Sequence, residues 1–100
     1  MIDKSDEYPS QIPKGKEPYL KALPIRELED VDMIEREVSL GNIVIAKITP
    51  LAQKNLEEVK RVIDDLCIFV KDLGGDIGRL GDERLVITPP TVKLWKEKED

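Results

Sequence analysis

Hydrophobic and polar positions divide this chain into short strands and two amphipathic helices. Residues 43–48, with the sequence IVIAKI, are apolar on both faces, and residues 85–87, LVI, have the same character. A strand that is apolar on both sides lies inside its sheet and is covered twice. Two helices would cover one face, so the pattern predicts a second protomer over the other face and hence a homodimer.

The clearest element is a helix over residues 50–73. Thr49 can cap it, Pro50 suits the first helical position, and Gly74 suits the end. Its main apolar stripe comprises Leu56, Val59, Ile63, Leu66, Val70 and Leu73. A second stripe comprises Val62, Cys67, Ile68 and Phe69. Two interpretations remain for the second stripe: a wide core-facing surface, or a face that meets another subunit.

Shorter elements complete the predicted fold. A strand over residues 19–23 precedes a helix that Asp30 or Asp32 can cap and that stops before Gly41. Glu35 follows Asp32 by three residues, the spacing of a capping box. Strands at 75–80 and 84–88 form a hairpin, and residues 92–95 form a last strand with Trp95 as a lid on the core. The turns depend on Gly74, Gly75 and Gly81. The sequence thus predicts an α+β sandwich of order β-α-β-α-β-β-β, with two helices on one face of a mixed five-stranded sheet.

The composition of the chain excludes some classes of function. The chain has 100 residues, enough for one small domain, and a net charge of −5 with acids interspersed among its bases. Clustered Lys and Arg are needed to bind phosphates, so nucleic acid is not an expected partner. The chain has no His and a single Cys, so no acid–base–nucleophile set can be named. We expect no enzymatic activity, no cofactor and no metal.

Two motifs suggest ligands but have simpler explanations. Gly75, Gly78 and Gly81 follow a helix and enter strands, whereas a dinucleotide-binding GxGxxG motif follows a strand and opens a helix. We interpret them as turn and hairpin residues. The acidic residues at positions 27–37 match no calcium-loop spacing, and a solvated acidic surface accounts for them.

Three segments carry a family resemblance: VIAKITPLA, LGGDIGRLG and RLVITPP. Together they resemble the core of SepF, a cell division protein, in its archaeal form, and the resemblance covers residues 19–95. It implies a dimeric domain with two helices on a five-stranded sheet. It also implies an adaptor that binds the C-terminal tail of FtsZ and links the division ring to the membrane, in the cytoplasm and peripheral at the division site.

The resemblance and the apolar patterns together predict which residues form the tail-binding site and the dimer interface. For the FtsZ tail these are Lys60, Arg61, Val62, Ile68, Phe69, Arg79 and Arg84. For the dimer interface they are Ile43, Ile45, Leu85 and Ile87. The tail groove is expected between the long helix and the hairpin, with its cations matching charges on the peptide.

The N-terminus departs from the family pattern. Residues 1–17 are predicted to be a flexible arm, 18–96 the SepF-like core and 97–100 a charged tail. The arm lacks the continuous apolar face of a membrane-surface helix, so a membrane link would need an N-terminal anchor that is not evident in this chain. The alternative function is a ferredoxin-like regulatory domain that binds a small metabolite, which would have four strands in another order.

Overall fold

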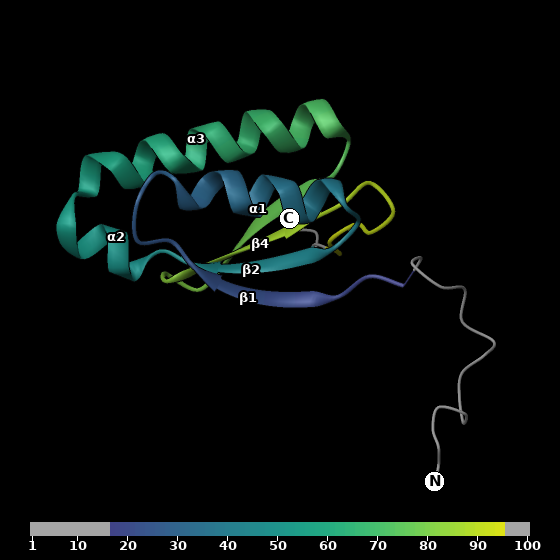
Figure 1. Ribbon diagram of the computed structural model, residues 1–100, viewed down its shortest axis with the longest axis horizontal. Helices are drawn as coiled ribbons and strands as arrows, with labels where there is room; N and C mark the ends of the chain where they lie inside the picture. The colour runs from purple at the N-terminus through teal and green to yellow at the C-terminus, as the bar shows by residue number, and fades with distance from the viewer. Residues whose placement is uncertain (1–16, 96–100) are drawn as a thin grey trace, which may run out of the picture.

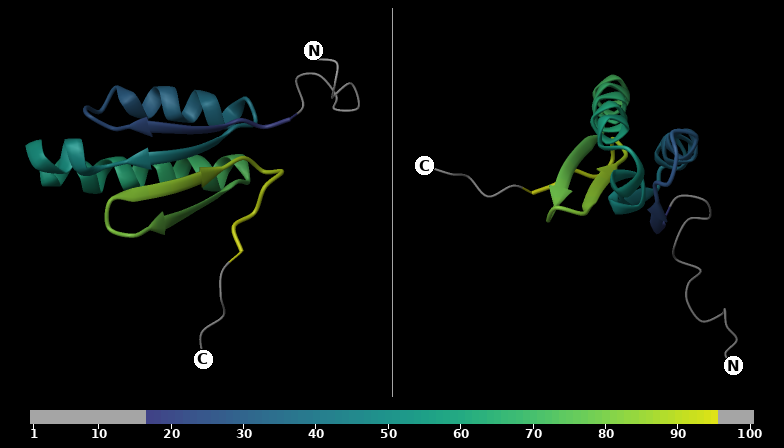
Figure 2. Two further views of the ribbon diagram at one scale, coloured as in Figure 1. Left: turned by 90° about the horizontal axis from the view of Figure 1, so that it is seen from below. Right: turned by 90° about the vertical axis from the view of Figure 1, so that its left-hand side faces the viewer.

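In the computed structural model, which describes residues 17–95, the two longer helices lie on one face of a four-stranded mixed sheet, and a short helix lies at one end of it (Figure 1). The elements are β1 (Leu20–Pro24), α1 (Asp30–Ser39), β2 (Ile43–Lys47), α2 (Thr49–Lys54), α3 (Leu56–Leu73), β3 (Asp76–Leu80) and β4 (Arg84–Thr88). The strand order is β1-β2-β4-β3, with β1 parallel to β2 and the other pairs antiparallel. Seen along the helices, α1 lies on the β1 side of the sheet and α3 on the β3–β4 side (Figure 2).

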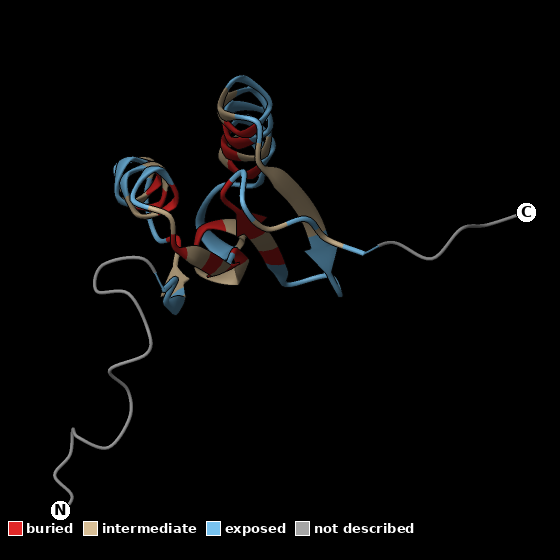
Figure 3. Ribbon diagram, turned by 90° about the vertical axis from the view of Figure 1, so that its right-hand side faces the viewer, coloured by how far each residue is buried: buried red, intermediate tan, exposed pale blue. Residues whose placement is uncertain are grey.

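The core lies between the helices and the sheet, where the buried residues gather (Figure 3). From the sheet it takes Val44, Ala46, Leu85 and Ile87, all at most 2% exposed. The pairing explains this set, because Val44 lies opposite Ile87 and Ala46 opposite Leu85. Residues that face each other across a ladder point to the same side of the sheet.

The other face of the sheet, which we call the open face, carries the alternate residues. Ile45 is paired with Val86, which is paired in turn with Gly78. Ile43 belongs to the same face because it is two residues from Ile45. The prediction that Leu85 and Ile87 share an interface with Ile43 and Ile45 is therefore wrong, since the two pairs lie on opposite faces.

The long helix predicted over residues 50–73 is two helices. Asn55 separates them with an extended backbone (φ −158°, ψ 102°). Its side-chain oxygen accepts hydrogen bonds from the N–H groups of Glu57 and Glu58, at 3.1 and 3.2 Å. An Asn at this position satisfies N–H groups that a continuing helix would have bonded to its own carbonyls. The break turns α3 away from α2.

The first helix begins differently from the predicted capping box. Asp32 lies inside α1 rather than at its cap. Asp30, the first residue of the helix, accepts hydrogen bonds from the N–H groups of Arg26 and Glu27 and so fixes the preceding turn. At the far end Gly41 has φ +100°, a left-handed conformation that suits glycine and stops the helix.

The predicted fifth strand at residues 92–95 is absent from the described structure, where this segment has no ladder partner. Pro89 and Pro90 have no N–H to continue β4. The hydroxyl of Thr88 donates to the carbonyl of Val92 at 2.7 Å, and the N–H of Leu94 donates to the side chain of Asp76 at 3.0 Å. These bonds lead the chain over the open face, and Trp95 is 86% exposed instead of covering the core. Residues 1–16 of the predicted arm at 1–17, and the predicted tail at 97–100, lie outside the described residues.

A polar network ties the end of α1 to the start of β1. Glu37 accepts hydrogen bonds from Asn42 at 2.8 Å and pairs with Lys21 at 2.9 Å. Asn42 also accepts from the N–H of Tyr19 at 3.0 Å, and it is nearly buried. The bonds from Lys21 and Asn42 hold the pKa of the Glu37 carboxyl below its ordinary value of 4.5.

This network predicts an acid-dependent loss of stability. Because the pKa of Glu37 is lower in the folded chain, the unfolded chain binds more protons in this range, and the stabilisation is present above pH 4.5 and lost as pH falls through the folded value. The difference in unfolding free energy between the wild-type chain and Glu37→Gln should therefore shrink on acidification. Urea titrations at a series of pH values measure it. A stability difference between the two chains that stays constant as the pH falls would contradict the lowered pKa of Glu37.

Candidate functional site

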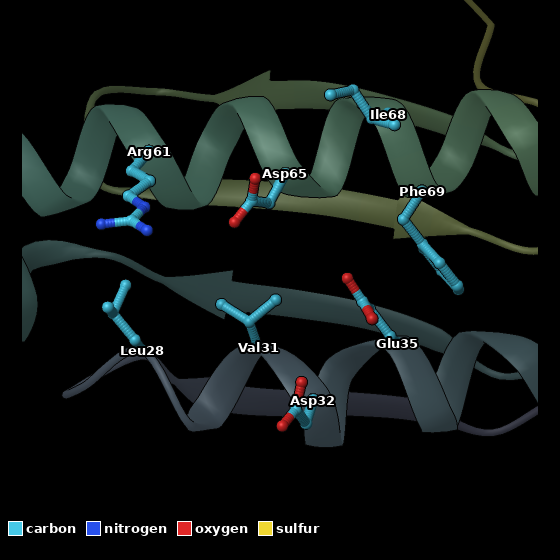
Figure 4. A pocket seen from close by; sticks show the side chains of 8 residues that line it. All are labelled: Leu28, Val31, Asp32, Glu35, Arg61, Asp65, Ile68 and Phe69. Carbon is cyan, nitrogen blue, oxygen red and sulfur yellow. The ribbon is translucent and has the colours of Figure 1, made fainter.

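A groove runs between α1 and α3 on the outer side of the helix layer (Figure 4). It has a volume of about 400 Å³ and is lined by Leu28, Val31, Asp32, Glu35, Arg61, Asp65, Ile68 and Phe69. The first four come from α1 and the turn before it, and the last four from α3. Each set contains residues three and four apart, a spacing that brings side chains to one flank of a helix.

The floor of the groove is apolar. Val31 is buried, Leu28 and Phe69 are half-buried against the core, and Ile68 is 62% exposed at the rim. An exposed Ile beside half-buried apolar neighbours offers surface that a ligand side chain can cover. The groove can therefore hold an apolar anchor without any rearrangement of the core.

The charged lining of the groove is mainly acidic. Asp32, Glu35 and Asp65 supply three carboxylates, against the single guanidinium of Arg61. Figure 4 shows Glu35 and Asp65 reaching into the space between the helices from opposite sides. Burial raises the pKa of the Glu35 carboxyl, and the nearby charges of Asp32 and Asp65 raise it further.

Three of the residues predicted to bind a tail lie together in this groove, namely Arg61, Ile68 and Phe69. The other four do not line it. Val62 is 1% exposed and belongs to the core, so its prediction as a binding residue is wrong. Lys60 is exposed on α3 outside the groove lining. The groove lies between two helices, not between helix and hairpin as the sequence suggested.

The two hairpin arginines lie away from the groove. Arg79 donates to the carbonyl of Asp82 at 3.3 Å within the hairpin. Arg84 is exposed and is paired with Lys47 on β2 and with Leu80 on β3. The register puts them on opposite faces of the hairpin, because Arg79 is paired with Leu85, whereas Arg84 is two residues from Val86 and belongs to the open face.

Sequence reasoning missed the α1 half of the groove. Asp32 and Glu35 were interpreted as a helix cap and a solvated surface, and Asp65 was not singled out. A usable signal was present: Leu28, Val31 and Glu35 share a helical spacing beside the core stripe of Val31, Ile34 and Val38.

Comparison with known proteins places the chain in a family. The family model described as "Cell division protein SepF" matches residues 21–94. The chain belongs to the SepF family. It is 36% identical over 70 residues to "Cell division protein SepF" of Haloferax volcanii. That alignment covers 70% of this chain but only 58% of the longer relative.

Solved structures of SepF-like proteins have the same fold. Those from Archaeoglobus fulgidus and Pyrococcus furiosus are each 32% identical, with a TM-score of 0.74. Each match covers 82% of this chain, and 98% and 99% of the respective structures. A third structure, "Cell division protein SepF from Methanobrevibacter smithii in complex with FtsZ-CTD", is 17% identical with a TM-score of 0.66 and covers 79% of this chain and 99% of that one. At that identity the match supports the fold alone.

Within residues 17–95, the acidic and Cys side chains include no group of three or more placed to hold a metal ion. In the same part of the chain, no helix is both long enough and apolar enough to cross a membrane.

Proposed function

We propose that this chain is a non-enzymatic adaptor of cell division that binds the C-terminal tail of FtsZ in the groove between α1 and α3. The observation that carries the proposal is the groove itself, which presents apolar side chains between charged ones on the surface of a SepF-family fold. A family member from Methanobrevibacter smithii was solved in complex with FtsZ-CTD, which supports the choice of partner.

The groove has the features that a short peptide needs. Peptides that dock against helices place one or two apolar side chains in a hydrophobic channel and pay an ordering cost that this burial must exceed. Ile68, Phe69 and Leu28 supply the channel. Because the channel is already open in the chain alone, binding requires ordering of the peptide only.

Ile68→Ala should weaken FtsZ-tail binding with little effect on folding. The side chain is 62% exposed, so its truncation should change the unfolding free energy by no more than about 0.5 kcal/mol. If the tail covers this side chain, the variant should lose about 1 kcal/mol or more of binding free energy, which raises Kd roughly fivefold. Fluorescence anisotropy of a labelled tail peptide measures this.

Cys67→Ala is the matched control, because Cys67 is the preceding, exposed residue on α3 and does not line the groove. Equal affinities of the wild-type chain and Ile68→Ala would remove the groove from the proposal. Phe69→Ala is a poorer probe than Ile68→Ala, because Phe69 also packs against the core and its truncation should lower stability as well as binding.

A second part of the proposal is a homodimer formed through the open face of the sheet. Its apolar residues include Leu20, Ile43, Ile45 and Val86, placed on one side by the strand register. No helix covers this side in the described residues (Figure 2). Apolar surface left in water favours association at about 25 cal/mol per Å². A second copy, related by a two-fold axis, would bury this face against an identical one.

Sedimentation at micromolar concentration should therefore show a dimer, and Ile45→Lys should shift it to a monomer, because two-fold packing would bury both new charges. Met33→Lys, a change at an exposed position on α1, should leave the dimer intact. A wild-type monomer under these conditions would contradict the dimer.

The cellular part of the proposal rests on the family. The adaptor would work in the cytoplasm at the division site, where it would link the FtsZ ring to the membrane. That link would be made through an N-terminal membrane anchor, as the family resemblance implies.

A further inference from the structure

We propose that the groove between α1 and α3 selects a peptide segment that carries Lys or Arg beside its apolar anchor. The sequence had suggested the reverse, a cationic site for an acidic peptide. This inference deepens the proposed function and rests on it, since it defines the charge pattern of the tail that the groove would accept.

The argument begins with the composition of the lining. Three carboxylates, from Asp32, Glu35 and Asp65, surround an apolar floor, and one guanidinium accompanies them. Glu35 and Asp65 come from different helices and reach into the same space (Figure 4). A cation placed between them would meet acidic groups from both walls.

Arg61 does not neutralise the groove. It lies one turn before Asp65 on the same helix, at the Leu28 end of the groove, whereas Glu35 lies at the Phe69 end (Figure 4). Glu35 has acidic neighbours on both helices, and their repulsion adds to its burial in raising its pKa. A ligand cation would relieve this repulsion, while a ligand carboxylate would increase it.

The same charges argue against other occupants. Two copies of this groove would oppose like charges, so a second copy of the chain is not suited to it. Phosphate-rich partners such as nucleic acid or an anionic membrane would be repelled. The apolar lining of Ile68, Phe69 and Leu28 calls for an apolar side chain. A peptide with an Ile or Leu anchor flanked by basic residues satisfies both requirements.

Two short synthetic peptides with the same Leu and Ile anchors test the inference, one flanked by Lys and the other by Glu. The wild-type chain should bind the Lys peptide at least about tenfold more tightly than the Glu peptide. Glu35→Gln and Asp65→Asn should each reduce this preference about threefold or more, and added salt should reduce it as well. Asp64→Asn is the matched control, since Asp64 is exposed on α3 but outside the groove lining.

Equal binding of both peptides, no binding of either, or a preference unaffected by Glu35→Gln and Asp65→Asn would overturn the inference. An FtsZ tail peptide serves as a third arm. If the tail binds but is indifferent to both substitutions, the inference fails and the proposed partner stands. If the Lys peptide binds as expected but the tail neither binds nor competes with it, the inference stands and the proposed partner fails.

Discussion

Leu66→Ala is expected to lower the free energy of unfolding by about 2–5 kcal/mol. Leu66 is fully buried in the middle of α3, within the core that joins this helix to the sheet. Its truncation removes apolar contacts and leaves a cavity. The surrounding helices and strands can close that cavity only in part. Chemical denaturation monitored by circular dichroism measures the loss. Ile68→Ala, two residues away and exposed, is the control, and a similar loss in both variants would contradict the orientation of α3.

Gly75→Ala is expected to destabilise the fold by about 3 kcal/mol, at the upper end of the usual cost of overpacking. A Cβ at Gly75 would clash with the carbonyl oxygen of Thr88, a backbone atom in the last residue of β4. The strand would have to move away from the end of α3 to make room. The thermal midpoint of the variant measures the effect.

Gly81→Ala is the matched control for this prediction. Gly81 has φ +73°, so alanine there should cost about 1–2 kcal/mol for the left-handed conformation, but nothing lies within 4 Å of the added atom. A loss for Gly75→Ala no larger than that for Gly81→Ala would show that the contact with Thr88 is easily relieved.

Local signals in the sequence predicted most of the framework. The apolar runs around Val44 and Ile87 gave two strands inside the sheet, and Gly41 and Gly74 ended helices where the sequence placed them. These features depend on neighbouring residues and on the conformational freedom of glycine, which a sequence displays directly.

Most of the errors have a different origin, because they depend on contacts distant in sequence, whereas the missed break at Asn55 is a local feature. Val62 lies inside the core because the position of α1 decides which flank of α3 turns inward. Leu85 and Ile87 were grouped with Ile43 and Ile45, but strand register decides the face, and a shift of one residue exchanges the two faces. The last segment alternates like a strand, yet bonds from Thr88 and Asp76 direct it over the sheet.

The candidate site was only half predictable for the same reason. The α3 half was visible as Ile68 and Phe69 on a stripe wider than one sheet contact requires. The α1 half becomes a wall of the groove only when the parallel pairing of β1 and β2 brings α1 beside α3. The ferredoxin-like alternative is not favoured by the element order, since both long helices precede the β3–β4 hairpin.

The central claim is that the groove between α1 and α3 receives the FtsZ tail, and NMR titration of the ¹⁵N-labelled chain with an unlabelled tail peptide tests it most directly. The account predicts saturable shifts concentrated in the amides of residues 28–35 and 61–69, the two walls of the groove. Small shifts in the hairpin at 80–84 serve as the internal reference. Shifts concentrated in the hairpin or on the open face, or no shifts at saturating peptide, would contradict the account.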